Sequence, residues 1–391
     1  MSILEKALEM LKKHPLCDHC LGRQFALLMR NMENEERGKA IKTVLVMEAQ
    51  VLAGSKKKEG LRILKILAAN GFSKTAEEIL RKMNKRVSRR NYPKVCFLCE
   101  NRFDFVDELS KKAVEKLTEY EYRNFLVGVE LPFKVEERED EFKARFGVEH
   151  GESIRIEFGR LLGKKISLYN GKTVEYGKPE IVVMINPMTS EMRFQVNPLF
   201  IAGRYKKLVR GIPQSKWFCS SCRGKGCEKC NWTGKMYPES VEEIISEPFL
   251  KAAGGVKTFF HASGREDIDA RMLGKGRPFA IEISQPKKRF LDLKKLEETV
   301  NAQARGKVKV SNLHFVDKDF VRRLKKAESA QKEYRVTVEF ENEVTDADLR
   351  LIEEKLSNAV VKQRTPIRVL HRRADLTREK YISKVEVKRV S

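Results

Sequence analysis

Apolar residues near the start of the chain recur at the spacing of one helix face. Leu4, Leu8 and Leu11 form the first such stripe. Ser73 has the side chain of a helix cap, and two glutamates follow it in the next turn. Three longer segments repeat the helical spacing: 21–32, 40–52 and 61–69. The pattern predicts that residues 1 to about 90 are mostly helical.

Between positions 105 and 205 helical and strand-like patterns are mixed. Helical spacing covers 106–117 and 154–162. Apolar or alternating runs that are typical of strands occupy 125–131, 181–185 and 192–196. This part of the chain is therefore expected to form an α/β module.

The region after position 241 also mixes the two patterns. Helices are predicted over 241–246, 291–304, 320–329 and 346–357. Strands are predicted over 280–283, 307–315, 334–340 and 384–390. In the segment 334–340 the aromatic or aliphatic positions alternate cleanly with polar ones, beginning at Tyr334. The whole pattern indicates an α+β protein with several domains.

The net charge indicates which kind of molecule the protein binds. Lysine and arginine number 79 against 55 acidic residues, which gives a formal charge of +24. A surplus of this size favours a polyanion, and nucleic acid is the leading candidate because each neutralised phosphate releases counterions. An anionic membrane surface is the alternative, but no apolar run approaches the length of a spanning helix and the N-terminus lacks a signal-peptide pattern. We therefore expect a soluble, cytoplasmic protein.

The eight cysteines form four Cys-x-x-Cys pairs. The first two pairs, Cys17/Cys20 and Cys96/Cys99, flank the helical block and are expected to share one structural zinc ion. The alternative is free or separately used thiols. Cys219, Cys222, Cys227 and Cys230 form a second, compact set of four ligands within a glycine-rich stretch. Zinc there serves stability, and nearby cations leave RNA contact open: Lys216, Arg223, Lys225, Lys229 and Lys235.

The stretch 264–279 concentrates charge between glycines. It contains the carboxylates Glu266, Asp267 and Asp269 together with three arginines, and a strand-like segment follows it. A carboxylate beside arginine stays ionised at neutral pH, so it suits a nucleophile or a charge partner better than a proton donor. The plainer interpretation is a solvated loop of ion pairs.

The residues of this loop resemble a known catalytic motif. Arg265-Glu266-Asp267 is similar to the Arg-x-Asp loop of pseudouridine synthases, and the run through Phe279 resembles the archaeal and eukaryotic tRNA pseudouridine synthase family that modifies the TΨC arm. The resemblance implies that Asp267 is the nucleophile, with Asp269 as the alternative. It also implies that Arg265 fills the space left by a flipped base and that Tyr334 stacks on the target uracil.

The same resemblance implies tRNA as partner and chemistry without a cofactor, acting on uridine 54, uridine 55 or both. The stretch that ends in Arg204, Tyr205 and Lys206 resembles the end of a THUMP domain, a small RNA-binding module. Further expected RNA contacts are Arg271 and Arg277, which could instead orient the loop, and Arg364, Arg368 and Arg372 in a basic family segment.

Four domains follow from these observations. They are a helical region with Cys-x-x-Cys pairs (1–104), a THUMP-like domain (105–210), a zinc ribbon (211–240) and a catalytic domain whose antiparallel sheet is backed by helices (241–391). The resemblance also implies a later strand with an apolar and a basic active-site residue, which the sequence to Ser391 does not contain. Since every earlier motif is intact, we expect that this sequence has been shortened. We also expect the protein to be a monomer.

Other classes of function remain open at this point. One is a zinc-containing protein that binds tRNA without catalysis, and a weaker one is a basic zinc protein that binds duplex DNA. Gly274 and Gly276 resemble a dinucleotide fingerprint, but Pro278 and the following strand exclude the helix start that such a site needs. No ATP or S-adenosylmethionine site is recognised.

Overall fold

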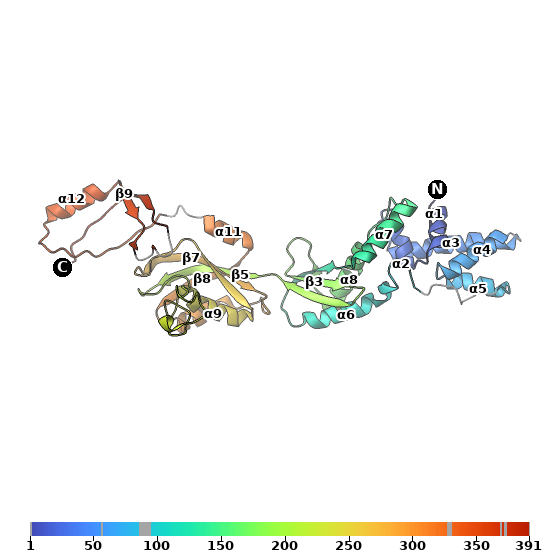
Figure 1. Ribbon diagram of the computed structural model, residues 1–391, viewed down its shortest axis with the longest axis horizontal. Coiled ribbons are helices and arrows are strands. Elements are labelled where there is room, and N and C mark those ends of the chain that lie inside the picture. Colours follow the sequence, from blue (N-terminus) through green and yellow to red (C-terminus); the bar gives the residue numbers. More distant parts are fainter. Residues whose placement is uncertain are drawn as a thin grey trace. The chain divides into compact units, whose positions relative to one another are not determined.

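The computed structural model describes residues 2–55, 58–85, 95–326, 331–367, 370 and 374–390 (Figure 1). The chain forms two compact units, Met1–Glu328 and Ser329–Ser391. The two units are taken separately below. Among the residues described, no helix has both the length and the apolar character that crossing a membrane requires.

The first part of the larger unit is helical, as predicted. Its elements are α1 (Ile3–Lys13), α2 (Asp18–Gly22), the 3-10 turn η1 (Arg23–Phe25), α3 (Asn34–Gly54), α4 (Lys58–Ala69) and α5 (Lys74–Lys82). The hydroxyl of Ser73 accepts a hydrogen bond from the amide of Ala76 at 3.2 Å, so the predicted cap at the start of α5 is confirmed.

The single helix predicted over 21–32 is wrong. Helix α2 ends at Gly22, and a 3-10 turn and irregular backbone follow. Helix α3 packs directly against Gly22, since a Cβ atom there would lie 1.8 Å from the carbonyl oxygen of Asn34. Leu21 and Phe25 are buried, whereas Leu27 and Met29 are 46% and 75% exposed, so the apolar residues of this stretch do not share one buried helix face.

The first sheet has the strand order β2-β1-β3-β4. Its strands are β1 (Asn124–Val129), β2 (Thr173–Val174), β3 (Ile181–Asn186) and β4 (Glu191–Val196). Strand β1 runs parallel to β2 and β3, and β4 is antiparallel to β3. The helices of this part are η3 (Arg102–Phe105), α6 (Val106–Leu117), α7 (Phe133–Phe146) and α8 (Ile154–Asn170). The predicted α/β module is confirmed, and it shares one continuous apolar core with the N-terminal helices.

A buried ion pair lies where these two parts meet. The guanidinium of Arg23 donates to the carboxylate of Glu139 in α7, and the Arg23 side chain has no exposed surface. The same carboxylate accepts from the amide of Ile154 at the start of α8, at 3.1 Å, and from Lys143 at 3.0 Å. Burial raises the pKa of Glu139, but Arg23 and Lys143 outweigh it and hold the pKa below its usual value. This carboxylate therefore joins three helical segments.

The second sheet is antiparallel throughout, with the order β6-β7-β5-β8. Its strands are β5 (Leu199–Lys207), β6 (Lys257–Ala262), β7 (Met272–Ser284) and β8 (Val308–Val316). The helices around it are the short η4 (Glu228–Cys230), α9 (Val241–Ala253), α10 (Leu293–Gln303) and α11 (Lys318–Lys326). Residues of α9 and α10 pack on one face of the sheet and residues of α11 on the other (Figure 1). The expected antiparallel sheet backed by helices is confirmed.

Strand β5 is where the structure differs most from the expected domain layout. The sequence assigned this stretch to the end of the THUMP-like domain, but β5 pairs with β7 and β8 in the second sheet. Residues 199–203 are all buried, which is typical of a central strand covered on both faces. Strand β6 was not predicted, because the adjacent Phe259 and Phe260 interrupt the alternation of apolar and polar residues.

The smaller unit contains α12 (Asp346–Leu356) and the antiparallel pair β9 (Ala359–Arg364) and β10 (Thr377–Ile382). Helix α12 was predicted. The strands predicted over 334–340 and 384–390 are wrong, since both segments are irregular in the described residues. A strand needs a partner's backbone groups, and the amide of Val385 instead donates to the hydroxyl of Ser357 at 3.1 Å.

We expect the buried ion pair between Arg23 and Glu139 to be a large contributor to stability. Changing Glu139→Gln removes one partner and leaves a buried guanidinium without its counter-charge, which costs about 3–5 kcal/mol. The urea midpoint of helix unfolding, followed by circular dichroism, should fall accordingly. The control is Glu9→Gln, which removes an exposed ion pair with Lys12 and should cost about 0–1 kcal/mol. Equal midpoints for the two variants would contradict the assignment.

Candidate active site and metal centres

The charged stretch of the sequence forms the connection from β6 to β7. Gly264 and Gly276 adopt left-handed backbone angles, with φ of 72° and 73°. At Gly276 the restriction is also steric, since a Cβ atom there would lie 2.8 Å from the carbonyl oxygen of Tyr205 on the neighbouring strand. The predicted glycine-bent loop is shorter than expected, because β7 already begins at Met272 and Gly276 lies within that strand. We call residues 264–271 the acidic loop.

A buried lysine of β5 holds the acidic loop. Lys207 has no exposed surface, and its ammonium nitrogen donates to the carbonyl oxygens of Asp267 at 2.7 Å and Ile268 at 3.2 Å. A third hydrogen bond, of 3.0 Å, goes to the carbonyl oxygen of Ile212 in the segment after β5. Because an ammonium group has three donor hydrogens, these three acceptors satisfy it completely. Lys207 thus fixes the backbone at Asp267 and Ile268.

A second contact fixes the loop through Glu266. Its carboxylate oxygen Oε2 accepts from the Tyr205 hydroxyl at 2.8 Å and from Arg277 Nε at 2.9 Å. The side chain of Gln214 donates to the Tyr205 oxygen at 2.7 Å and to the carbonyl oxygen of Gly264 at 3.0 Å. Only 5% of the Glu266 side chain is exposed. Glu266 therefore supports the loop from its buried side and does not face solvent.

Burial determines how the supporting groups titrate. It lowers the pKa of the Lys207 ammonium below its usual value, although the carboxylates of Glu266, Asp267 and Asp269 oppose this effect. Burial, followed by the Glu266 charge, raises the pKa of the Tyr205 phenol well above its usual value. Tyr205 accordingly stays protonated at neutral pH and donates to Glu266.

The residues of the acidic loop that are predicted to take part in catalysis lie on its exposed side. Asp267 is exposed, and its Oδ1 accepts from the amide of Ile268 at 2.6 Å. Asp269 is exposed two residues further on. The Arg265 guanidinium lies 5.9 Å from the ring centre of Trp217. Asp267, the alternative Asp269 and Arg265 therefore belong to one loop, and their catalytic roles stay predictions.

Three residues that were predicted to contact RNA are buried or hold other parts of the protein. The Tyr205 ring is fully buried in the core of the second sheet, so the prediction that it contacts RNA is wrong in this structure. Arg277 is held inside by Glu266 and by the carbonyl oxygen of Ser263, at 2.7 Å, which favours the alternative role of orienting the loop. Arg204 donates to the carbonyl oxygens of residues 275 and 276, both at 2.7 Å, and braces β7.

The remaining residues predicted to contact RNA or the target base are at least partly exposed or lie outside the described residues. Lys206 is partly exposed on β5, and Arg271 is exposed at the end of the acidic loop. Tyr334 and Arg364 belong to the smaller unit, where Tyr334 is exposed and Arg364 forms an ion pair with Asp375. Arg368 and Arg372 lie outside the described residues. The roles of these residues stay predictions.

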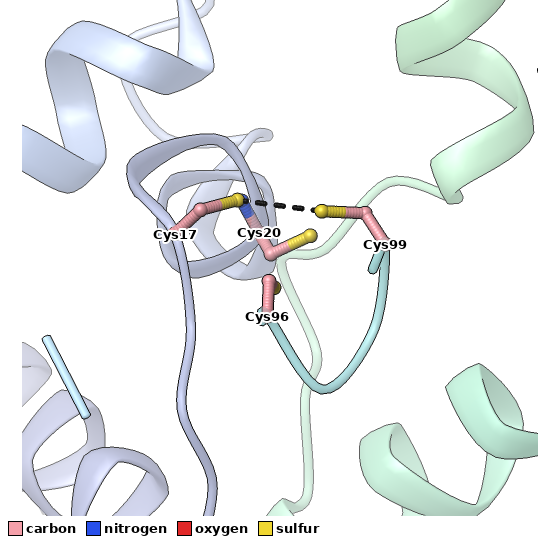
Figure 2. A group of neighbouring side chains, drawn as sticks. All are labelled: Cys17, Cys20, Cys96 and Cys99. Atoms are coloured by element: carbon pink, nitrogen blue, oxygen red, sulfur yellow. Dashed lines mark hydrogen bonds between the residues drawn. The ribbon is translucent and has the colours of Figure 1, made fainter. Parts of the chain in front are cut away.

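The four cysteines that flank the helical block converge (Figure 2). The sulfur atoms of Cys17, Cys20, Cys96 and Cys99 all lie within 4.8 Å of one another, and Cys17 and Cys99 are separated by 3.6 Å. Three of the four side chains are fully buried. The predicted sharing of one site by two distant Cys-x-x-Cys pairs is thus supported by the geometry.

The second cluster is built within a short hairpin that we call the cysteine ribbon (residues 216–236). Its sulfur–sulfur distances are 3.8 Å for Cys219 and Cys227, 3.8 Å for Cys222 and Cys230, and 3.7 Å for Cys227 and Cys230. Burial raises the pKa of Cys230, but backbone amides of Cys227 and Gly234 outweigh it, and the pKa falls to about 6. The lowered pKa favours the thiolate form of Cys230, whereas burial and the neighbouring Cys230 sulfur raise the pKa of Cys227 to about 11.

These distances can be compared with the size of a zinc site. A tetrahedron with zinc–sulfur bonds of about 2.3 Å has edges of about 3.8 Å. The observed separations match that value and far exceed the length of a disulfide bond, about 2.05 Å. Both clusters therefore fit a tetrahedral metal ion, and four thiolates are the ligand set typical of structural zinc.

Comparisons with known proteins find relatives that match nearly the whole chain. Residues 200–391 match the family model described as Pus10, C-terminal, and residues 109–186 match the archaeal Pus10 THUMP domain. A protein of Methanocaldococcus jannaschii named tRNA pseudouridine synthase Pus10 is 46% identical, over 98% of this chain and 82% of the relative. Proteins of the same name from Methanothrix thermoacetophila and Pyrococcus furiosus are 39% and 36% identical, covering 100% and 98% of this chain and 83% and 84% of the relatives.

The chain belongs to the Pus10 family. The resemblance seen in the acidic loop is thereby confirmed, and so is a THUMP domain between the N-terminal helices and the second sheet. In this member of the Pus10 family the THUMP model ends at residue 186, before β5, in agreement with the pairing of β5 in the second sheet.

Sequence reasoning missed two residues of the loop support, Lys207 and Gln214. Lys207 follows another lysine in a basic run, and the charge pattern alone makes both look like surface cations. A weak signal existed: Lys207 is two residues after Tyr205, and alternate residues of a strand face the same side. Gln214 offers no such signal, because it lies in irregular backbone.

We expect Lys207→Met to loosen the acidic loop. The change removes the ammonium donor from three carbonyl oxygens. Those of Asp267 and Ile268 keep the amides of Ala270 and Gly211, at 3.2 and 3.0 Å, so the loss falls mainly on the Ile212 oxygen, and an unsatisfied buried group costs about 1–3 kcal/mol. Hydrogen exchange of the backbone amides in residues 264–276, measured by mass spectrometry, should become faster, while exchange in β3 stays unchanged. The matched control is Lys206→Met on the same strand, where the side chain is partly exposed. Similar exchange in both variants would rule out the role given to Lys207.

We expect the purified protein to contain two zinc ions per chain, one for each cluster. Cys99→Ser and Cys230→Ser should each reduce the zinc content to one, because a tetrahedral site that loses a thiolate binds zinc far more weakly. Elemental analysis of the dialysed proteins measures this directly. A zinc content that stays at two in either variant would show that the altered cysteine is not a ligand.

Proposed function

We propose that this member of the Pus10 family is a tRNA pseudouridine synthase that isomerises uridine 54, uridine 55 or both in the TΨC loop. Family membership and the names of its relatives support the activity, and the charge of +24 supports a polyanionic substrate. The observation that carries the proposal is the acidic loop. Buried groups hold its backbone, and they leave the Asp267 carboxylate at the surface, where a flipped nucleotide can reach it.

The reaction rearranges a single nucleotide. The bond between N1 of uracil and C1′ of the ribose breaks, the base turns, and a bond forms between C5 and C1′. The proton on C5 leaves and N1 takes up a proton, so atoms and electrons balance without an external reagent. An ionised carboxylate close to the ribose or base assists this exchange as a nucleophile, and we assign that role to Asp267.

The other loop residues have supporting roles in this proposal. Arg265 fills the stack that the flipped uridine leaves, and its position beside Trp217 keeps it at the edge of the loop. Tyr334 stacks on the target uracil. Glu266, Arg277 and Lys207 act as positioning residues, because they hold the loop and do not reach its outer side.

The metal sites have a structural role in this proposal. Zinc at the first cluster would join residues 17–20 to residues 96–99, and zinc at the second would close the cysteine ribbon. The isomerisation involves no change of oxidation state and no transferred group, so the chemistry proposed here requires no cofactor. We place the boundary between the THUMP domain and the catalytic domain between β4 and β5, and the partner is tRNA.

We expect Asp267→Asn to abolish product formation while tRNA affinity changes less than about threefold. The substitution keeps the shape of the side chain and removes its charge, and loss of a covalent nucleophile typically costs several orders of magnitude in rate. The assay is incubation with an unmodified tRNA transcript, followed by mapping of pseudouridine at single-nucleotide resolution. Asp269→Asn, two residues away and also exposed, is the matched control and should stay active.

The possible outcomes separate the hypotheses. Pseudouridine at position 54 or 55 made by the wild-type chain establishes the activity and its site. If Asp269→Asn is inactive and Asp267→Asn is active, the nucleophile has been assigned to the wrong carboxylate. Tight tRNA binding without product in the wild-type chain would instead favour the non-catalytic, zinc-containing tRNA-binding protein.

A further inference from the structure

The cysteine ribbon presents one of the two tryptophans of the chain to solvent. Trp232 is 73% exposed, whereas Trp217 at the base of the ribbon is 7% exposed. Single exposed apolar residues are common on protein surfaces and need no explanation by themselves. The exposure of Trp232 is of interest because of how its backbone is held and which charges surround it.

The backbone at Trp232 adopts an unusual conformation. Asn231 and Trp232 both have left-handed angles, with φ of 47° and 60°. Asparagine tolerates this region, but a bulky residue there is an outlier. The amide of Trp232 donates to the carbonyl oxygen of Cys227 at 2.9 Å, and a Cβ atom on Gly226 would lie 2.9 Å from the Trp232 carbonyl oxygen. The metal-binding hairpin therefore fixes the backbone from which this ring projects.

Three exposed cations accompany Trp232 on the ribbon. Arg223, Lys225 and Lys229 are exposed, and none of them forms an ion pair within the part of the chain that the structure describes. Glu228 is the single acidic residue between positions 216 and 236. Even with the two negative charges of a zinc ion bound by four thiolates, the ribbon keeps a net positive charge. The aromatic ring thus lies in a surface that attracts anions.

The base of the ribbon adjoins the acidic loop. The Trp217 ring lies 5.9 Å from the Arg265 guanidinium, and the amide of Gly211, shortly before the ribbon, donates to the carbonyl oxygen of Ile268 at 3.0 Å. An RNA that delivers a nucleotide to Asp267 therefore passes close to this hairpin.

We propose that Trp232 is a stacking platform for an unpaired base of the RNA that binds at the acidic loop, with Arg223, Lys225 and Lys229 contacting the flanking phosphates. The proposal rests on the proposed function for the identity of the RNA. Exposed aromatic rings among cations are the usual means of binding single-stranded nucleic acid, because every base has a face that can stack. A protein partner is less well matched because the surface is cationic and the sequence neighbours of Trp232 are polar, although Phe218 and Met236 of the ribbon are also 49% and 40% exposed.

Because the chain has only two tryptophans, fluorescence can report on this site alone. Trp217→Phe leaves Trp232 as the sole tryptophan, and an unmodified tRNA transcript should quench its emission in a saturable manner. A blunt RNA duplex at the same salt concentration should quench it much less, because its bases are already stacked. Trp232→Phe leaves the buried Trp217, whose emission should change less.

Affinity gives the second measurement. Trp232→Ala should weaken tRNA binding by about 5–100-fold, the range for one stacked base, while Trp232→Phe should lose less. The control is Phe133→Ala on α7, where the ring is 74% exposed but Glu136 and Glu137 follow it. Zinc content of each variant verifies that the ribbon is intact. Replacing Arg223, Lys225 and Lys229 by glutamine should reduce the slope of log affinity against log salt by about 2.

The outcomes distinguish this inference from the proposed function. If Trp232→Ala binds tRNA with wild-type affinity, or if tRNA does not quench the protein that retains only Trp232, the platform is ruled out, and the exposed ring serves a protein contact or none. Quenching and weakened binding without pseudouridine formation by the wild-type chain would instead sustain the platform and reject the enzymatic function.

Discussion

The acidic loop depends on the solvation of one buried ammonium group. An isolated charge inside a protein is costly, so Lys207 is compatible with the fold only where enough acceptors surround it. The carbonyl oxygens of Ile212, Asp267 and Ile268 supply them. Any movement of the loop away from β5 would remove acceptors from the ammonium. The need to solvate Lys207 therefore fixes the backbone of the loop more firmly than contacts among its own exposed side chains could.

The same principle operates where the N-terminal helices meet the THUMP domain. Arg23 is fully buried and is matched by Glu139, whose carboxylate also accepts from the first turn of α8. The neighbouring cysteines bring together segments far apart in the sequence, in a cluster that could hold a metal ion. In both regions a buried charged group joins separate pieces of chain, and in the N-terminal region it does so beside a continuous apolar core. Such contacts fail as a set when one partner is lost, which couples the order of each region to a single side chain.

Elements that depend on local sequence pattern could be predicted, whereas strand pairing between segments distant in sequence could not. Helix α6 begins and ends where its periodicity does, and both sets of four cysteines could be grouped by spacing. The stretch that forms β5 was assigned to the THUMP-like domain, because its true neighbours β7 and β8 are distant in sequence and cannot be found from local pattern. The segment 334–340 alternates and still forms no strand, because alternation describes one face of a strand and not the hydrogen bonds that make it.

The candidate site shows the same division between buried and exposed charge. Composition predicted a basic surface for RNA, and Arg271 and Arg277 could each have contacted phosphate or oriented the loop. In the structure, the buried Lys207 and the largely buried Arg277 hold the loop. Lys206, Arg271 and the exposed cations of the cysteine ribbon remain at the surface. Positioning groups must be buried to resist water, and groups that bind a polyanion must be accessible to it. Burial therefore separates the two roles where residue type does not.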